Sequence, residues 1–152
     1  MTDDWLELLS ELTTAEVRFL VVGAHALAVH GIPRGTQDLD VWIERSAENA
    51  ARAWRALAAF GAPLESIDVS RTDLEQPNVV VQLGLPPNRI DLMTGISGVA
   101  DFALAWSRRV EGPVRGRPIP FLGRADLVAN KRAAGRPKDL ADVAALEEQA
   151  KP

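Results

Sequence analysis

The chain contains no cysteine, so disulfide bonds, thiolate metal sites and cysteine nucleophiles are excluded. It also has no apolar run near the roughly 18–20 residues that a membrane-spanning helix needs. The first four residues, Met1-Thr2-Asp3-Asp4, are acidic and lack the basic start of a secretory signal peptide. Neither an internal repeat nor a low-complexity tract is present. These absences predict a cytoplasmic protein without a membrane partner.

What the sequence does have is the composition of one globular domain. Of its 152 residues, 47% are hydrophobic and 25% are charged, which excludes an intrinsically disordered chain. This length is typical of a single domain, so we expect one domain over residues 1–152.

Charge is distributed unevenly along the chain. The net charge is −4, which argues against a nucleic-acid partner. Residues 108–138, however, carry nine basic and two acidic side chains, a local charge of +7. This segment is either a phosphate-binding surface or a solvated face rich in arginine.

The hydrophobic pattern predicts helices and strands in mixed order. Helices are expected over residues 5–12, 24–29, 47–60, 99–109, 124–134 and 138–149, and strands over residues 18–22, 38–43, 79–83, 89–93 and 118–122. The last strand contains two prolines, which cannot donate to a strand ladder, so we expect it at an edge of the sheet. The predicted class is α/β (α+β), with a small mixed β-sheet covered by helices.

Three aspartates carry the main chemical signal. Asp38 and Asp40 stand two residues apart at the start of a predicted strand, so their carboxylates share one face. Asp91 lies in another apolar strand, where an acid needs a cation. If the strands are neighbours, the three acids suit Mg²⁺ and two-metal phosphoryl chemistry. The alternatives are that Asp38 caps a turn and Asp91 pairs with Arg89, or that the short Asp-x-Asp motif is of the glycosyltransferase kind.

A glycine turn precedes these acids. The apolar strand ends at Gly23-Ala24, and a helix is expected to begin there. Free backbone N–H groups at such a turn can bind a phosphate, although glycine at a strand-to-helix turn also has purely conformational uses.

Taken together, these motifs resemble the nucleotidyltransferase superfamily, whose fold is that of polymerase beta. The signature of that superfamily is a hydrophobic residue, Gly, then Gly or Ser, a spacer, Asp-x-(Asp or Glu), and a later third acid. Within it, the sequence is similar to the AbiEii-type toxin branch and its small relatives. The motifs that carry the resemblance are Gly23-Ala24, His30-Gly31, Arg34-x-Thr36, Asp38-x-Asp40 and the closing segment 131–142, so that it spans a core of about residues 16–146.

The resemblance implies a role for each of these residues. Gly23 and the backbone of Ala24 would hold the triphosphate of an NTP. Asp38, Asp40 and Asp91 would be catalytic and would bind Mg²⁺ as two ions, with Mn²⁺ as a substitute. The reaction would transfer a nucleoside monophosphate to a hydroxyl of RNA (tRNA) or protein, in a toxin–antitoxin context with an antitoxin protein as partner.

Other residues leave alternatives open. Arg34 either steadies the triphosphate or a contact between a helix and a loop, or it forms a salt bridge with Asp38 or Asp40. Lys131 is the better triphosphate ligand, whereas Lys138 is expected to have a structural role at a helix end. Ala24 departs from the Gly or Ser of the signature. That departure favours the alternative functions: a nucleotide-binding or protein-interaction module with little or no activity, or an antitoxin-like partner.

Overall fold

The computed structural model describes all of residues 1–152 as a six-stranded mixed sheet with helices on both sides. The helices are α1 (Asp3–Thr14), α2 (Gly23–Val29), α3 (Ala47–Phe60), α4 (Phe102–Ser107), α5 (Arg124–Ala134) and α6 (Pro137–Ala150), with a 3-10 helix, η1, at Arg71–Glu75. The strands are β1 (Phe19–Val22), β2 (Asp38–Ile43), β3 (Val80–Leu83), β4 (Arg89–Met93), β5 (Val110–Val114) and β6 (Arg117–Phe121). The predicted fold class is therefore confirmed.

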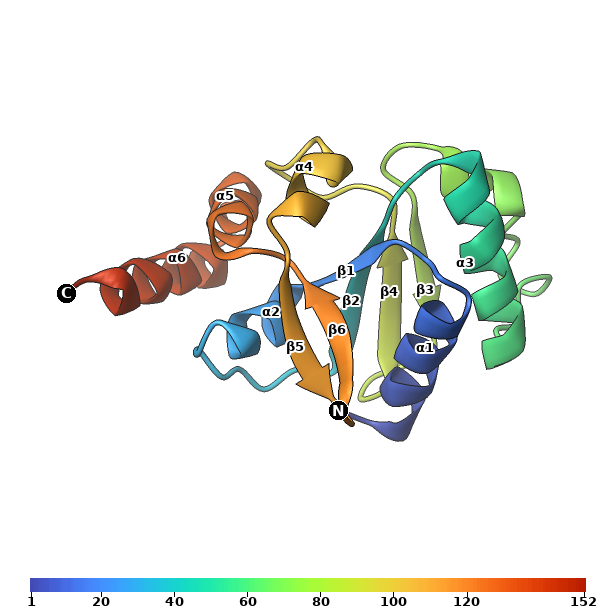
Figure 1. The fold of residues 1–152 in the computed structure, drawn as a ribbon, viewed down its shortest axis with the longest axis horizontal. Coiled ribbons are helices and arrows are strands. Elements are labelled where there is room, and N and C mark those ends of the chain that lie inside the picture. The colour runs from blue at the N-terminus through green and yellow to red at the C-terminus, as the bar shows by residue number, and fades with distance from the viewer.

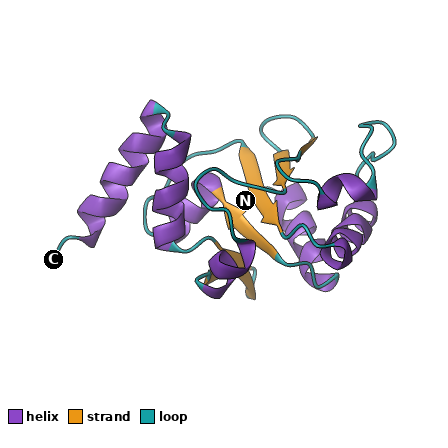
Figure 2. Ribbon diagram, turned by 90° about the horizontal axis from the view of Figure 1, so that it is seen from above, coloured by secondary structure: helices purple, strands orange, loops and turns teal.

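The strand order is β3-β4-β2-β1-β6-β5. Two of the pairs, β2 with β4 and β1 with β6, are parallel, and the other three are antiparallel. Helices α1 and α3 lie together on one side of the sheet, and α5 and α6 lie on the opposite side (Figures 1 and 2). The pairing of β2 with β4 decides the site, because it brings two acidic segments that are far apart in the sequence onto neighbouring strands.

Local signals explain why β2 and α3 have the predicted bounds. Leu39, Val41 and Ile43 of β2 are completely buried, so this face of the strand packs into the core. The side chain of Ser46 accepts a hydrogen bond from the backbone N–H of Asn49 and so caps α3. Gly61 ends the helix in the left-handed conformation, with φ +90°.

The β5–β6 hairpin differs from the prediction. Strand β5 was not predicted from its sequence, Val-Glu-Gly-Pro-Val, because glycine and proline both have low strand propensity. Since β5 takes the edge, β6 lies inside the sheet between β1 and β5, and the prediction that it is an edge strand is wrong. The prolines of β6 are tolerated because β1 pairs with it only near its end, at Val21 and Phe121.

Helix α4 is shorter than the predicted range of residues 99–109. It begins where the side chain of Asp101 accepts a hydrogen bond from the N–H of Leu104, after an isolated bridge between Ile96 and Val99. None of the helices combines the length and hydrophobicity required to span a membrane.

Candidate functional site: a carboxylate cavity beside a basic cavity

Strands β2 and β4 bring the three predicted acids together. In their parallel pairing Asp40 stands opposite Asp91, and Asp38 stands opposite Arg89. All four line one cavity of about 380 Å³, called here the carboxylate cavity. Asp91 is 8% exposed, whereas the side chain of Asp38 is 39% exposed. The predicted convergence of Asp38, Asp40 and Asp91 is therefore present in the fold.

Arg89 lies among these carboxylates as their counter-ion. It donates from Nε to Oδ1 of Asp91 and from Nη2 to Oδ2, both at 3.0 Å, and its Nε lies 3.8 Å from Oδ1 of Asp38. The ion pair of Asp91 with Arg89, which the sequence left open as an alternative, thus coexists with the acidic cluster. Its signal in the sequence is the alternation Arg89-x-Asp91, which places both side chains on one face of the strand.

Asp40 is the carboxylate with the least compensation. Burial, together with the charges of Asp91 and Asp38, raises its pKa to about 6, against the lowering effect of Arg89 and Lys131. As the side chains stand, no group of three or more acids or histidines is arranged to hold a metal ion. The oxygen donor set nevertheless fits Mg²⁺ chemically, because crowded carboxylates with a raised pKa bind a divalent cation well. Ligation by Asp91 would require release of its bidentate pair with Arg89.

Gly23 lies directly against Asp40. Its φ is +69°, and a Cβ at this position would stand 2.3 Å from Oδ2 of Asp40. The turn therefore needs glycine both for its backbone conformation and for this close approach. Helix α2, which begins here, has only seven residues, so a phosphate at this turn would depend on cations from elsewhere in the fold.

Those cations surround a second cavity, of about 260 Å³, which we call the basic cavity. It is lined by Gly23 and Ala24 of the turn, by Asp38 and Asp40, and by Arg34, Lys131, Arg136 and Lys138. Lys131, Arg136 and Lys138 belong to the positive segment 108–138 and also line the carboxylate cavity. The predicted nucleotide-binding residues Gly23, Ala24, Arg34 and Lys131 thus lie around one cavity.

Ion pairs hold three of these cations, Arg34, Lys131 and Arg136, in place. Nζ of Lys131 lies 3.0 Å from Oδ2 of Asp142 and 3.5 Å from Oδ1 of Asp139. Arg34 pairs with Asp142, so the alternative of a bridge from Arg34 to Asp38 or Asp40 is wrong. Nε of Arg136 donates to Asp139 at 2.6 Å.

The pKa of Asp139 shows how strongly these ion pairs compensate its buried charge. Burial alone would raise its pKa, but the hydrogen bonds and charge of Arg136, with the charge of Lys131, outweigh burial and hold the pKa below its usual value. The five side chains Arg34, Asp142, Lys131, Asp139 and Arg136 therefore form one connected network between the loop before β2 and helices α5 and α6.

Arg136 and Lys138 were not predicted as nucleotide ligands. Lys138 is exposed, lines both cavities and makes none of the ion pairs of the structure, in contrast to the structural role expected for it. The positive charge of segment 108–138 was the available signal. Two other arginines of that segment contact α6: Arg132 pairs with Glu147, and Arg124 donates a hydrogen bond to Gln149.

Comparison with solved structures bears on the fold. A protein of Thermotoga maritima, described as a candidate nucleotidyltransferase, superposes with a TM-score of 0.59 over 95% of this chain and 89% of that one, at 17% identity. The chain has the nucleotidyltransferase fold. ANT(2″)-Ia in complex with adenylyl-2″-tobramycin overlaps less well, with a TM-score of 0.49 and 13% identity over 99% of this chain and 100% of that one, too weak a likeness to support a conclusion. No model of a protein family and no curated protein matches the chain.

Within this nucleotidyltransferase fold, substitution of Gly23 tests the contact between the turn and Asp40. Gly23→Ala is expected to lower the free energy of unfolding by more than the roughly 1–2 kcal/mol that a positive φ costs an L-residue, because the added Cβ also displaces the Asp40 carboxylate. Thermal and urea denaturation measure this loss. The matched control is Gly116→Ala, at φ +77° with nothing within 4 Å of the new Cβ. Equal losses in the two variants would contradict the contact.

Proposed function

We propose that this protein is a Mg²⁺-dependent nucleotidyltransferase that moves a nucleoside monophosphate from an NTP to a hydroxyl. The observation that carries the proposal is that the two cavities share lining residues. Gly23, Asp38, Asp40 and Lys131 line both the carboxylate cavity and the basic cavity. The fold therefore offers adjoining places for an anionic triphosphate and for a cation held by the acid cluster, both on the central strands of the sheet. Phosphoryl transfer requires this pairing.

In this proposal the basic residues bind the phosphates and the acidic residues hold the metal ion. Lys131, Arg136, Lys138 and Arg34 bind and orient the phosphates in the basic cavity, with the backbone at Gly23 and Ala24 beside them. Asp38, Asp40 and Asp91 hold Mg²⁺, which when bound supplies the charge that stabilises the transferring phosphate. Arg89 neutralises Asp91 and Asp38, and it would have to release Asp91 before that carboxylate could hold a cation.

The finer parts of this function come from the resemblance alone. RNA (tRNA) or protein as the acceptor, membership of the AbiEii-type branch, and a role in a toxin–antitoxin pair with an antitoxin partner all stay predictions. Ala24 keeps a backbone N–H at the turn but offers no hydroxyl, so phosphate binding there depends on the backbone and the four cations.

Transfer of a labelled α-phosphate tests the function. The protein is incubated with each of the four NTPs labelled at the α-phosphate, with Mg²⁺ and cell extract, and incorporation of label is followed. We expect label to be transferred and pyrophosphate released by the wild type, and neither with Asp38→Ala plus Asp40→Ala. Equal labelling by the double variant would overturn the proposal.

A non-catalytic nucleotide-binding module is the rival function, and the ion pair of Arg89 with Asp91 is the observation that favours it, since it occupies a proposed metal ligand. Calorimetric titration with NTP separates the two. Binding that is indifferent to Mg²⁺ and leaves the nucleotide intact supports the rival, whereas binding that requires Mg²⁺ and yields pyrophosphate supports the transferase.

A further inference from the structure

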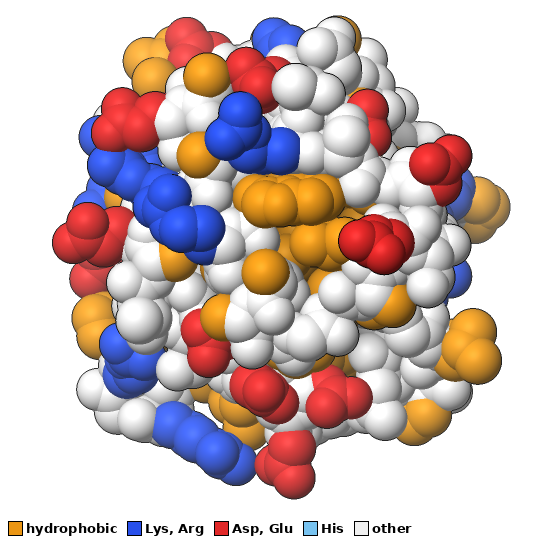
Figure 3. Space-filling view, turned by 90° about the vertical axis from the view of Figure 1, so that its right-hand side faces the viewer, with side chains coloured by type: hydrophobic (Ala, Val, Ile, Leu, Met, Phe, Trp, Pro, Cys, Tyr) orange, Lys and Arg blue, Asp and Glu red, His pale blue; other side chains and the backbone are white.

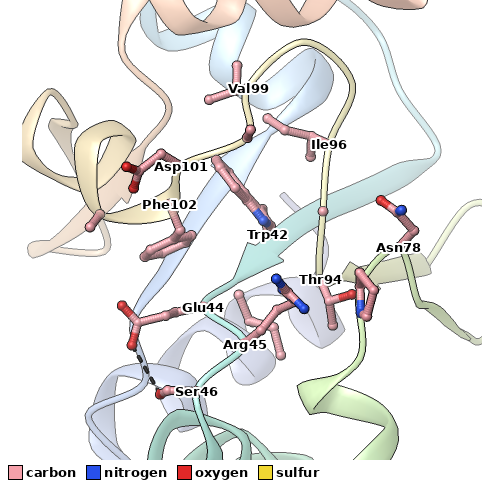
Figure 4. Close-up of a pocket in the computed structure, with 15 residues that line it drawn as sticks. Trp42, Glu44, Arg45, Ser46, Asn78, Thr94, Ile96, Val99, Asp101 and Phe102 are labelled. Carbon is pink, nitrogen blue, oxygen red and sulfur yellow. Dashed lines mark hydrogen bonds between the residues drawn. The ribbon is translucent and has the colours of Figure 1, made fainter.

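A third cavity, of about 830 Å³, lies beside α4 and has no part in the function proposed so far. We call it the α4 cavity. Its apolar surface comes from Trp42, Ile96, Val99 and Phe102, and Trp42 and Phe102 meet edge to face with ring centroids 4.9 Å apart. Figure 4 shows Trp42 at the centre, with Phe102 beside it, Val99 and Ile96 above it and Arg45 below it.

The α4 cavity adjoins the carboxylate cavity. Gly95 and Ile96, in the loop after β4, line both. Asp38, Asp40 and Trp42 alternate along β2 and so share one face, with Trp42 about 7 Å beyond Asp40 along the strand. A molecule in the α4 cavity therefore lies within reach of the acid cluster.

The α4 cavity and the basic cavity lie at opposite ends of β2. The basic cavity is lined by Gly35 and Thr36, which precede the strand, whereas the α4 cavity is lined by Trp42 and Ile43 at its other end. Displacement at phosphorus requires the attacking and leaving oxygens to be roughly in line. With the pyrophosphate held by the basic cavity, the attacking hydroxyl must approach from the side of the α4 cavity.

The lining of this cavity indicates what kind of molecule enters. Its volume lies in the range of small-molecule sites, and its walls mix apolar side chains with polar and charged ones. Its charged residues are Glu44, Arg45 and Asp101, and Glu44 is already paired with Arg18 at 3.6 Å. A nucleic-acid site needs a surplus of cations for the phosphate backbone, and this surface has none. On the neighbouring α3 side, basic and acidic side chains are interspersed (Figure 3).

We propose that the α4 cavity binds the acceptor, and that the acceptor is a small molecule with an apolar ring or chain and a free hydroxyl. This rests on the proposed function. The hydroxyl oxygen forms a bond to the α-phosphorus of the NTP, and the bond from that phosphorus to the bridging oxygen breaks. Its electron pair leaves with pyrophosphate, and the hydroxyl proton passes to the acid cluster and then to solvent. Arg45 and Asn78, whose side chains make no hydrogen bond within the protein, are the polar groups available to orient the acceptor.

Filling the cavity tests this assignment. Ala103 is exposed on α4 and lines the cavity, so Ala103→Trp places an indole in the acceptor space. Ala58→Trp, exposed on α3 and outside the cavities described, is the matched control. Arg45→Ala is a second variant, at an exposed position where no side-chain hydrogen bond or ion pair is lost. Cell extract is separated into RNA, protein and a fraction below about 1 kDa, and each is offered with α-labelled NTP and Mg²⁺.

We expect label to enter the low-mass fraction and to survive nuclease and protease. Ala103→Trp should lower this transfer at least 10-fold and Arg45→Ala should raise the KM for the fraction, with Ala58→Trp unchanged. The thermal shift caused by NTP and Mg²⁺ should be the same in all four proteins. Label found in RNA or protein, or full transfer by Ala103→Trp, overturns this inference alone. Absence of both the NTP-induced shift and any labelling overturns the proposed function itself.

Discussion

Asp40→Asn is expected to abolish nucleotidyl transfer and yet to make the metal-free protein more stable. Loss of transfer should reach about 1,000-fold in kcat/KM, equivalent to about 4 kcal/mol of transition-state stabilisation, because a proposed carboxylate ligand of the metal ion is removed. The gain in stability arises from the pKa of this carboxyl, which burial, Asp91 and Asp38 raise to about 6. At pH 7.5 the folded protein must hold Asp40 ionised against that preference.

The sign follows from proton linkage. The pKa of Asp40 rises from 3.8 in the unfolded chain to about 6 in the folded one, so between these values the folded state binds more protons. The contribution of Asp40 to stability therefore falls as pH rises from about 4 to about 6. Above that window Asp40→Asn should be more stable than the wild type by about 1–3 kcal/mol, and the difference should shrink towards zero near pH 4.

Urea denaturation in EDTA between pH 4 and pH 8, beside the labelling assay, measures both effects. Asp38→Asn is the matched control on the same strand: its side chain is 39% exposed, so we expect lost transfer with little change in stability. Mg²⁺ should stabilise the wild type at pH 7.5 and should stabilise Asp40→Asn much less. An Asp40→Asn protein that is less stable than the wild type at pH 7.5 would refute the view that Asp40 lies in an uncompensated acidic cluster.

The sequence predicts the acidic half of the site well because its signals are local. The alternation Asp38-x-Asp40 places both carboxylates on one face of a strand whatever the rest of the fold does. That Asp40 stands opposite Asp91 depends on the parallel pairing of β2 with β4. The hydrophobic character of both segments predicts that they are strands, but it does not give the register in which they pair.

The basic half could not be predicted in the same way, because its contacts join distant segments. Arg34 and Asp142, which form an ion pair, are 108 residues apart, and no periodicity connects them. The α4 cavity likewise depends on where α4 starts, which is fixed by Asp101 and by the short bridge before it. Strand β5 was missed for a related reason: its pairing with β6 overrides the weak strand propensity of its own residues.

Lys131 provides the second large expected effect, because it belongs to the buried ion-pair network and also lines the proposed phosphate site. Its side chain is 9% exposed, and the two carboxylates that it pairs with, Asp139 and Asp142, are 1% and 6% exposed. An ammonium group has three N–H donors. Three donors are enough for the two carboxylates, at 3.0 and 3.5 Å from Nζ, and for a phosphate in the basic cavity that Lys131 lines. The structural contacts and the predicted triphosphate contact are therefore compatible.

Lys131→Met is expected to lower the free energy of unfolding by about 3 kcal/mol, because breaking a buried pair leaves carboxylates without their full compensation. Chemical denaturation measures this loss. The double variant Lys131→Met plus Asp142→Asn should recover part of the lost free energy of unfolding, since one buried carboxylate charge is then removed. The recovered double variant, tested at a temperature where it is folded, separates the two roles of the lysine. If its KM for NTP is at least 10-fold above that of Asp142→Asn alone, Lys131 binds phosphate; an unchanged KM would limit Lys131 to holding α5 against α6.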